Sequence, residues 1–351
     1  MIKIVRSKLF LWLWLSVLLG SFSSLPAVSV ATGVATQQKG RGQLNSRYAI
    51  FQHPDASFFG AFDGHCGEKA ADFASKSLLV SLLSRIAPDM FSDETVMCAA
   101  IKEAVQEVEE SFGILAQKHA LRDGATALFT LMCDDMLYVG NIGDCRAVLS
   151  CKGKAKPLST EHDTDRNDEY LRWEERGYTY QWCGQVLRTP GCDTYPSGFP
   201  FTRALGFVPY KTQYPGLLLT TPDIKVNHLK DGDEFLILAS ASLWRVLENQ
   251  GAVDLVRGYL QQHPHDLHGA ADLLRRSAQQ TDNCTVIVIA FDHEDELIND
   301  FSLLGVDDKE NLAVEDKEKD DKVKQNLALL RNLQSEHTQQ GAHTQNGCCL
   351  L

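Results

Sequence analysis

Short β-rich runs alternate with amphipathic helical runs from about Thr32 to His293. β-Branched, aromatic and leucine residues gather in segments that the pattern predicts as strands: Ser57 to Phe62, Thr126 to Cys133, Met136 to Asn141, Arg146 to Cys151, Leu217 to Thr220, Glu234 to Ala239 and Thr285 to Phe291. Elsewhere apolar residues recur at three and four positions, which predicts helices: Lys69 to Ile86, Asp93 to Ala120, Asn167 to Arg176, Ala252 to Gln262 and Leu267 to Gln279.

The order of these elements favours one domain over residues 32–293, without an internal repeat. Consecutive strands are joined by short turns and the helices come in pairs, which is typical of a layered α+β sandwich rather than a doubly wound parallel sheet. The stretch 178–200 is rich in Gly, Pro, Ser and Thr, and it predicts a long irregular loop that serves as a lid or a binding surface.

Residues 294–351 form a tail of different character. Residues 294–322 hold 12 acids and 4 lysines, and a weak amphipathic helix with Val323, Leu327, Leu330 and Leu333 follows. The tail is expected to be largely disordered, either as a solvated segment or as one that docks a partner through this helix.

The two ends of the chain carry conflicting targeting signals. Lys3, Arg6 and Lys8 precede an apolar run over residues 9–19, and small residues follow to Ala31, so residues 1–31 resemble a secretory signal peptide or a retained membrane anchor. The last four residues, Cys348 to Leu351, fit a prenylation box or are an accidental cysteine pair. The first signal predicts the secretory pathway or membrane association through the N-terminal segment, and the second predicts the cytoplasmic face of a membrane through a lipid on Cys348.

Composition narrows the function classes. With 34 Lys and Arg against 46 Asp and Glu, the formal net charge is -12, which argues against nucleic acid as a partner. The 10 cysteines form no CxxC pair, so neither a zinc module nor a disulfide scaffold is indicated. Cys66 and Cys145 are expected to pack as small apolar residues rather than to sense redox state.

One strand runs directly into acidic and histidine residues. The apolar segment Phe58 to Phe62 is followed by Asp63, Gly64 and His65. A carboxylate at the end of a rigid strand, followed by a glycine where the backbone approaches closely, suits a hard metal ion. Single signals of this kind are weak, because Asp at a strand end is most often a turn former.

Taken in order, the motifs resemble the metal-dependent protein phosphatases of the type 2C serine/threonine family from Arg41 to Phe291. Besides the Asp63 segment, the matching motifs are Asp123 to Ala127, Val139 to Leu149, Leu158 to Asp163, Thr202 to Gly206, Asp233 to Ser240 with Leu243 and Trp244, and Asp282 to Val288. The resemblance implies a four-layer α-β-β-α sandwich, with two antiparallel sheets flanked by helix pairs. It also implies that His162, within one of these motifs, is a packing and hydrogen-bonding residue.

The resemblance also implies a catalytic site. In the family, two Mg²⁺ or Mn²⁺ ions activate a bridging water that attacks phosphorus. Retained family positions are Asp63, the Gly64 carbonyl, Asp144 and Asp282 as metal ligands, His65 as the general acid, and Arg41 as a phosphate-binding residue. Arg203 and Arg245 are expected to complete a phosphate-sized basic pocket with Arg41.

Several family acids are missing from this chain. The acidic pair of the opening motif falls on Asn45 and Ser46, and two further acids fall on Ala241 and Arg245. Phe207 replaces another. Because Mg²⁺ and Mn²⁺ need several negative oxygens, we expect at most one weakly bound ion, and we expect Arg245 to pair with Asp144 or Asp282. His65 is then a vestigial general acid.

Three functions follow as hypotheses. The preferred one is a pseudophosphatase, a regulatory or binding protein that recognises a protein partner or a phosphoprotein without hydrolysing it. The second is a divergent Mg²⁺/Mn²⁺-dependent serine/threonine phosphatase, with one ion or with nearby acids as substitute ligands. The third is a plain scaffold, with the 178–200 loop and the tail as contact surfaces.

Overall fold

The computed structural model describes residues 29–37, 45–53, 56–163, 165–178, 181–182, 187–188, 199–278 and 283–292. All of them belong to one unit that ends at Glu296. The predictions for residues 1–28, for most of the 178–200 loop and for residues 293–351 lie outside the described residues. None of the described helices is both long and apolar enough to cross a membrane.

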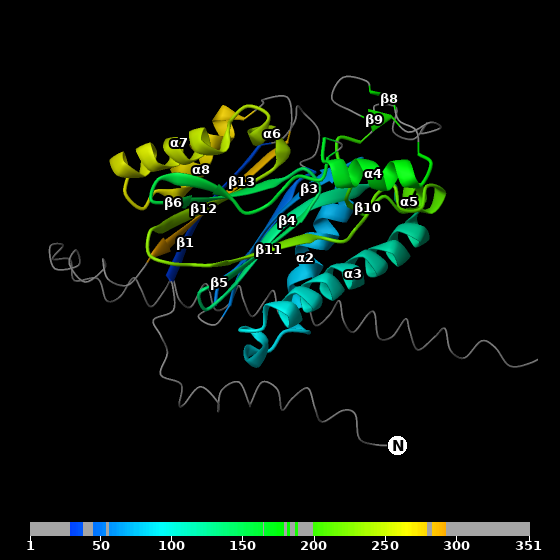
Figure 1. The fold of residues 1–351 in the computed structure, drawn as a ribbon, viewed down its shortest axis with the longest axis horizontal. Coiled ribbons are helices and arrows are strands. Elements are labelled where there is room, and N and C mark those ends of the chain that lie inside the picture. Colours follow the sequence, from blue (N-terminus) through cyan, green and yellow to red (C-terminus); the bar gives the residue numbers. More distant parts are fainter. Residues whose placement is uncertain are drawn as a thin grey trace, which may run out of the picture. The chain divides into compact units, whose positions relative to one another are not determined.

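Two antiparallel sheets form the centre of the fold (Figure 1). The first has the order β1-β13-β12-β6-β7, with β1 over Ser29–Gln37, β13 over Cys284–Asp292, β12 over Asp233–Ala239, β6 over Arg146–Cys151 and β7 over Lys154–Pro157. The second has the order β11-β5-β4-β3-β2, with β11 over Asp223–His228, β5 over Met136–Ile142, β4 over Gly124–Cys133, β3 over Ser57–His65 and β2 over Arg47–Phe51. The two-residue β10 (Leu205–Gly206) pairs with β4, and β8 (Gln181–Trp182) pairs with β9 (Leu187–Arg188).

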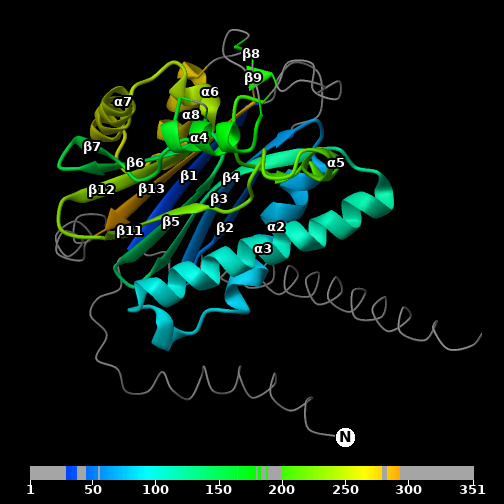
Figure 2. The ribbon, with the colours of Figure 1, turned by 45° about the vertical axis from the view of Figure 1, so that its right-hand side comes forward.

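Helix pairs cover the outer faces of the sheets (Figure 2). Helices α2 (Lys69–Leu83) and α3 (Glu94–His119) pack on the second sheet, and α7 (Asn249–Gln262) and α8 (Leu267–Ser277) pack on the first. A third apolar layer lies between the sheets, where Phe59, Leu128, Leu149 and Ile287 are all buried. The four-layer α+β sandwich predicted from the sequence is therefore confirmed.

The remaining described helices are short and lie near the sheet ends. They are η1 (Pro88–Met90), α4 (Asn167–Glu175), α5 (Val208–Gln213) and α6 (Ala241–Trp244).

The predicted elements agree with the structure with one exception. Leu217 to Thr220 is not a strand: only an isolated bridge between Arg203 and Leu219 forms there. Leu217 and Leu218 are buried beneath Trp173 and Tyr210, so the apolar run reflects packing against α4 and α5 rather than strand pairing.

Seven of the described strands were not predicted: the two-residue β8, β9 and β10, and four longer strands, β1, β2, β7 and β11. All four pair at or next to a sheet edge, where sequence alternation is weak. β1 contains Gly33, and a Cβ atom there would lie 2.1 Å from the carbonyl carbon of Leu267, so small residues let α8 approach the strand closely. β1 starts at Ser29, three residues before the expected domain boundary at Thr32.

Candidate active site

The ends of strands from both sheets meet at one group of polar residues. Asp63 and His65 end β3, Asp144 lies in the turn between β5 and β6, and Ala241 begins α6 directly after β12. The β3 and β4 register pairs Asp63 with Thr126, and the β12 and β6 register pairs Ala239 with Arg146. The fold therefore brings together these four positions, which the motif resemblance assigns to one site.

Gly64 allows the segment around Asn45 to lie against β3. A Cβ atom at Gly64 would be 2.3 Å from the carbonyl oxygen of Asn45 and 2.8 Å from that of Gly67. Ser46, which follows Asn45, is fully buried and donates a hydrogen bond from Oγ to Asp63 Oδ1 at 2.6 Å. A hydroxyl thus donates to a carboxylate at a position where the family carries a second acid.

His65 lies beside Asp63 and an aromatic ring. Its Nε2 is 3.9 Å from Asp63 Oδ2, and its ring centroid is 4.9 Å from that of Phe201. Within the described part of the chain, His65 Nε2 is buried and has no hydrogen-bond partner. Packing against Phe201 and the nearby Asp63 carboxylate therefore position this edge of the imidazole.

Asp144 is buried and faces a guanidinium. Burial raises the pKa of Asp144 to about 6, with a further upward contribution from Asp63, while His65 and Arg245 act in the opposite direction. Arg245 Nη2 lies 3.8 Å from Asp144 Oδ2. The predicted pairing of Arg245 with Asp144 is thus found, and the cation that faces this acid comes from the protein itself.

Ala241 leaves a methyl group where the family carries a ligand. It is 9% exposed and starts α6, which is fixed by Trp244 Nε1 donating to the Ala239 carbonyl at 3.0 Å. The Cys145 thiol lies beneath, within 3.4 Å of Thr126 Oγ1, and burial raises its pKa well above the usual value. This confirms Cys145 as a packing residue; Cys66, in contrast, is exposed.

These residues do not fit a centre for two divalent ions. Asp63 accepts from Ser46, Asp144 faces Arg245, and Ala241 offers no side-chain oxygen. In the described ranges, no group of three or more His, Cys, Asp or Glu side chains is arranged to hold a metal ion. Asp282 and Arg41 lie outside the described residues.

Arg203 does not line a phosphate pocket, which corrects the expectation from the sequence. Its Nε donates to Glu169 Oε1 at 2.8 Å, and its Nη1 donates to Asp223 Oδ1 at 2.8 Å and to the Thr221 carbonyl at 2.9 Å. The residue is 9% exposed. Because its donors are bound by the buried Glu169 carboxylate, by Asp223 and by a backbone carbonyl, Arg203 is a structural residue.

Glu169 and Asp223 are the residues that sequence reasoning missed. Burial alone would raise the pKa of Glu169, but hydrogen bonds from Arg203, Thr202 and Arg172 lower it to about 2. His162 is fully buried, accepts from the Gly143 amide at Nδ1 over 3.1 Å, and places Nε2 3.2 Å from Asp223 Oδ2. His162 is therefore a packing and hydrogen-bonding residue, as predicted.

Phe207 replaces a family acid with part of an aromatic cluster. It is 1% exposed, and its ring centroid lies 4.9 Å from Phe199 and 6.1 Å from Phe201. Phe201 in turn contacts His65. Asp63 and Asp144 are called the acidic cluster below. Beside this cluster, Phe207 packs against aromatic rings at a position where the family carries a carboxylate.

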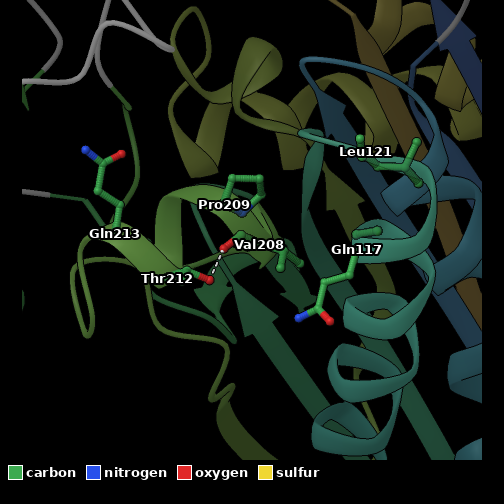
Figure 3. A pocket seen from close by; sticks show the side chains of 8 residues that line it. Gln117, Leu121, Val208, Pro209, Thr212 and Gln213 are labelled. Carbon is green, nitrogen blue, oxygen red and sulfur yellow. Dashed lines mark hydrogen bonds between the residues drawn. The ribbon is translucent and has the colours of Figure 1, made fainter.

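A separate hollow of about 430 Å³ lies between the end of α3 and α5 (Figure 3). Gln117 of α3 and Leu121, two residues after this helix, face Val208 and Pro209 of α5 across it. Its lining contains no acidic, basic, histidine or cysteine side chain. This hollow therefore has none of the groups that phosphoester chemistry requires.

Comparison with known proteins identifies the family. The family model described as Protein phosphatase 2C matches residues 37–287. The chain belongs to the protein phosphatase 2C family. The resemblance inferred from the motifs is thereby confirmed, and this family typically depends on Mg²⁺ or Mn²⁺.

Relatives in the protein phosphatase 2C family include two rice proteins. "Probable protein phosphatase 2C 52" and "Probable protein phosphatase 2C member 13, mitochondrial", both from Oryza sativa subsp. japonica, are each 34% identical over 239 residues, which is 68% of this chain. The match spans 45% of the first relative and 61% of the second.

Two solved structures share the fold. A Caenorhabditis elegans sex determining protein aligns with a TM-score of 0.65 at 18% identity, covering 81% of this chain and 71% of that one. The serine-threonine phosphatase 2C from Toxoplasma gondii aligns with a TM-score of 0.63 at 20% identity, covering 77% and 96%.

Proposed function

We propose that this protein is a pseudophosphatase, a protein phosphatase 2C fold that binds a phosphorylated protein partner without hydrolysing it. The observation that carries the proposal is Arg245, whose guanidinium lies 3.8 Å from Asp144 at the position of a family acid. Ala241 and Ser46 support it, since each removes a carboxylate from the same cluster.

Electrostatics explains why these changes disable a two-ion centre. By the family template, one ion needs Asp63, Asp282 and the acid now at Ala241, and the other needs Asp63, the Gly64 carbonyl and the acid now at Asn45. Divalent cations lose tightly bound water on entering a site, and only several anionic oxygens compensate for that cost. A guanidinium in the same cluster repels a divalent cation, and the repulsion is strong where burial lowers the local dielectric. Turnover by metal-activated water is therefore not expected.

The same cluster retains a cation that can hold an anion. The side chain of Arg245 is 36% exposed, so an anion in solvent can reach its guanidinium. A guanidinium can bind a phosphate through two parallel hydrogen bonds. We therefore assign recognition of a phosphorylated side chain to Arg245, and not to Arg203.

Hydrolysis of a phosphothreonine peptide and of p-nitrophenyl phosphate in excess Mn²⁺ tests the proposal. The wild-type rate is expected to equal that of Asp63→Ala, while the variant Asn45→Glu/Ala241→Asp/Arg245→Asp, which restores three family acids, is expected to gain Mn²⁺-dependent activity. Wild-type hydrolysis that is abolished by Asp63→Ala would instead establish a divergent phosphatase.

Binding is measured separately by fluorescence anisotropy with the same phosphopeptide. Wild type is expected to bind the phosphorylated peptide more tightly than its unphosphorylated form, and Arg245→Ala is expected to lose that difference. Equal affinity for both peptides would leave only the scaffold function, without phosphate recognition.

A further inference from the structure

Lysines gather along one side of the sandwich, where the edge strands of the two sheets meet. Lys154 and Lys156 lie on β7, Lys225 lies on β11, Lys152 is in the turn before β7, and Lys102 is on α3. All five are exposed. Figure 2 shows β7 and β11 on the same side of the molecule. This group is called the lysine edge below.

Direct contacts show that the lysine edge is continuous. Lys156 Nζ donates to Asn227 Oδ1 at 2.6 Å and so joins β7 to β11. Lys225 lies two residues before Asn227 and therefore on the same side of β11. The Lys152 amide donates to the Gly232 carbonyl at 2.7 Å, which joins the turn before β7 to the loop that follows β11.

The charges of the lysine edge are largely uncompensated. Among the described residues, no ion pair within 4.0 Å involves Lys102, Lys152, Lys154 or Lys225. Asp223 lies near Lys225, but it is already paired with Arg166 and Arg203. The Glu234 carboxylate, which accepts from the Gly153 amide in the turn before β7, is likewise paired, with Arg257. Such a group of exposed lysines is unexpected in a chain whose formal net charge is -12.

A hollow of about 380 Å³ lies within the lysine edge. Lys102 and Lys225 line it, together with Ser159, Thr160, Asn141 and Asp223, whose carboxylate is paired with Arg166 and Arg203. Asn141 is 1% exposed, and its Oδ1 has no hydrogen-bond partner among the described residues. The hollow therefore offers two cationic groups for a phosphate and a buried acceptor for an ammonium or hydroxyl group, which is the chemistry of a phospholipid headgroup.

Lys154 of the lysine edge and the start of β1 lie at the same end of the first sheet. Register pairs Ser29 with Asp292, Phe235 with Ala290, Asp233 with Cys151, and Cys151 with Lys154. Ser29 and Lys154 therefore lie at the same end of the sheet, four strand spacings or about 19 Å apart. The apolar run of residues 9–19, with Lys3, Arg6 and Lys8 before it, precedes β1 in the chain.

We propose that the lysine edge binds the surface of an anionic membrane, with a lipid headgroup in the hollow between Lys102 and Lys225. Exposed lysines attract acidic lipids, and a weak apolar anchor becomes stable when a basic surface adds a second contact. An acidic protein is the competing partner. The apolar run that leads into the same end of the sheet favours the membrane. This proposal does not depend on the state of the acidic cluster.

Vesicle flotation of the full chain tests the proposal, with phosphatidylcholine vesicles that contain or lack phosphatidylserine. Wild type is expected to bind the phosphatidylserine vesicles more strongly, and high salt is expected to remove the difference. Lys102→Gln/Lys154→Gln/Lys225→Gln is expected to lower partitioning onto phosphatidylserine vesicles about 100-fold, because each lysine contributes roughly fivefold. Circular dichroism of the variant checks that it is folded.

The matched control is Lys69→Gln/Lys76→Gln/Lys118→Gln, which removes the same charge from α2 and from the last turn of α3. It is expected to partition like wild type. Equal partitioning of the lysine-edge variant and the control would overturn the proposal. So would a lysine-edge variant that binds vesicles like wild type but loses binding to polyglutamate, since the surface would then be a protein-docking site.

Discussion

Ser46 and Arg245 stand at positions where the family carries carboxylates, and each contacts a retained acid. Ser46 donates to Asp63, and Arg245 faces Asp144. A buried carboxylate without a cation or hydrogen-bond donor is costly, so acids that hold no ion require substitutes of this kind. At the residue scale, the chain itself supplies a donor and a cation to the acids that bound ions would otherwise neutralise.

The buried ion-pair network around Glu169 predicts a specific acid sensitivity. The pKa of Glu169 in the fold is about 2, below its ordinary value of 4.5. Its contribution to stability is therefore fully present above pH 4.5 and is lost as pH falls toward 2. Glu169→Gln is expected to lower the free energy of unfolding by about 3 kcal/mol at pH 7, because Arg203 and Arg172 lose a buried partner.

Urea denaturation at pH 7 and pH 3 measures the Glu169 effect. The difference between wild type and Glu169→Gln should narrow at the lower pH. Asp168→Asn is the control, since Asp168 is 59% exposed in its pair with Arg166 and should contribute less than about 1 kcal/mol. Equal losses in the two variants would contradict a buried network.

The motifs predicted a group of retained and replaced site positions that the fold brings close together where they are described, but the role predicted for Arg203 was wrong. Asp63, His65, Asp144 and Arg245 follow from motifs that are contiguous in the chain. The partners of Arg203 come from 34 and 20 residues away. Only tertiary packing brings Glu169 and Asp223 to that guanidinium, so no local pattern could reveal that its donors are occupied.

At the scale of elements, the sequence pattern predicted the central strands of each sheet but not the edge strands. β4 is buried at every position, and its apolar run alone predicts a strand. β7 carries alternating lysines, and β1 contains mainly small residues, so neither shows a large apolar face. Both are recognised only through their pairing with β6 and β13.

The close contact of β1 with α8 gives a prediction at this scale. Gly33→Ala would place a Cβ atom 2.1 Å from the Leu267 carbonyl carbon and oxygen, which are backbone atoms and cannot rotate away. The substitution is expected to cost about 3 kcal/mol or more, because strand and helix must separate. The midpoint of thermal unfolding measures it.

Gly113→Ala is the matched control for Gly33→Ala. Gly113 lies within α3, and a Cβ atom there would have no atom within 4 Å. Alanine is expected to stabilise the helix by up to about 1 kcal/mol. Similar effects of the two substitutions would contradict the packing of α8 on β1.

At the scale of the whole molecule, the fold should not depend on metal. Any ion that binds the native state raises its stability according to its concentration and affinity. Millimolar Mn²⁺ is therefore expected to leave the melting temperature of wild type unchanged and to raise that of Asn45→Glu/Ala241→Asp/Arg245→Asp. Differential scanning fluorimetry with and without EDTA measures both. A Mn²⁺-dependent rise in wild type that disappears in Asp63→Ala would contradict the expectation.

The most direct test of the disabled metal centre is a crystal structure from crystals soaked in MnCl₂, with the ions located by anomalous scattering. The account predicts no pair of Mn²⁺ ions beside Asp63 and a guanidinium from Arg245 still facing Asp144. Two Mn²⁺ ions about 4 Å apart, bridged by Asp63 and a shared oxygen, would contradict it.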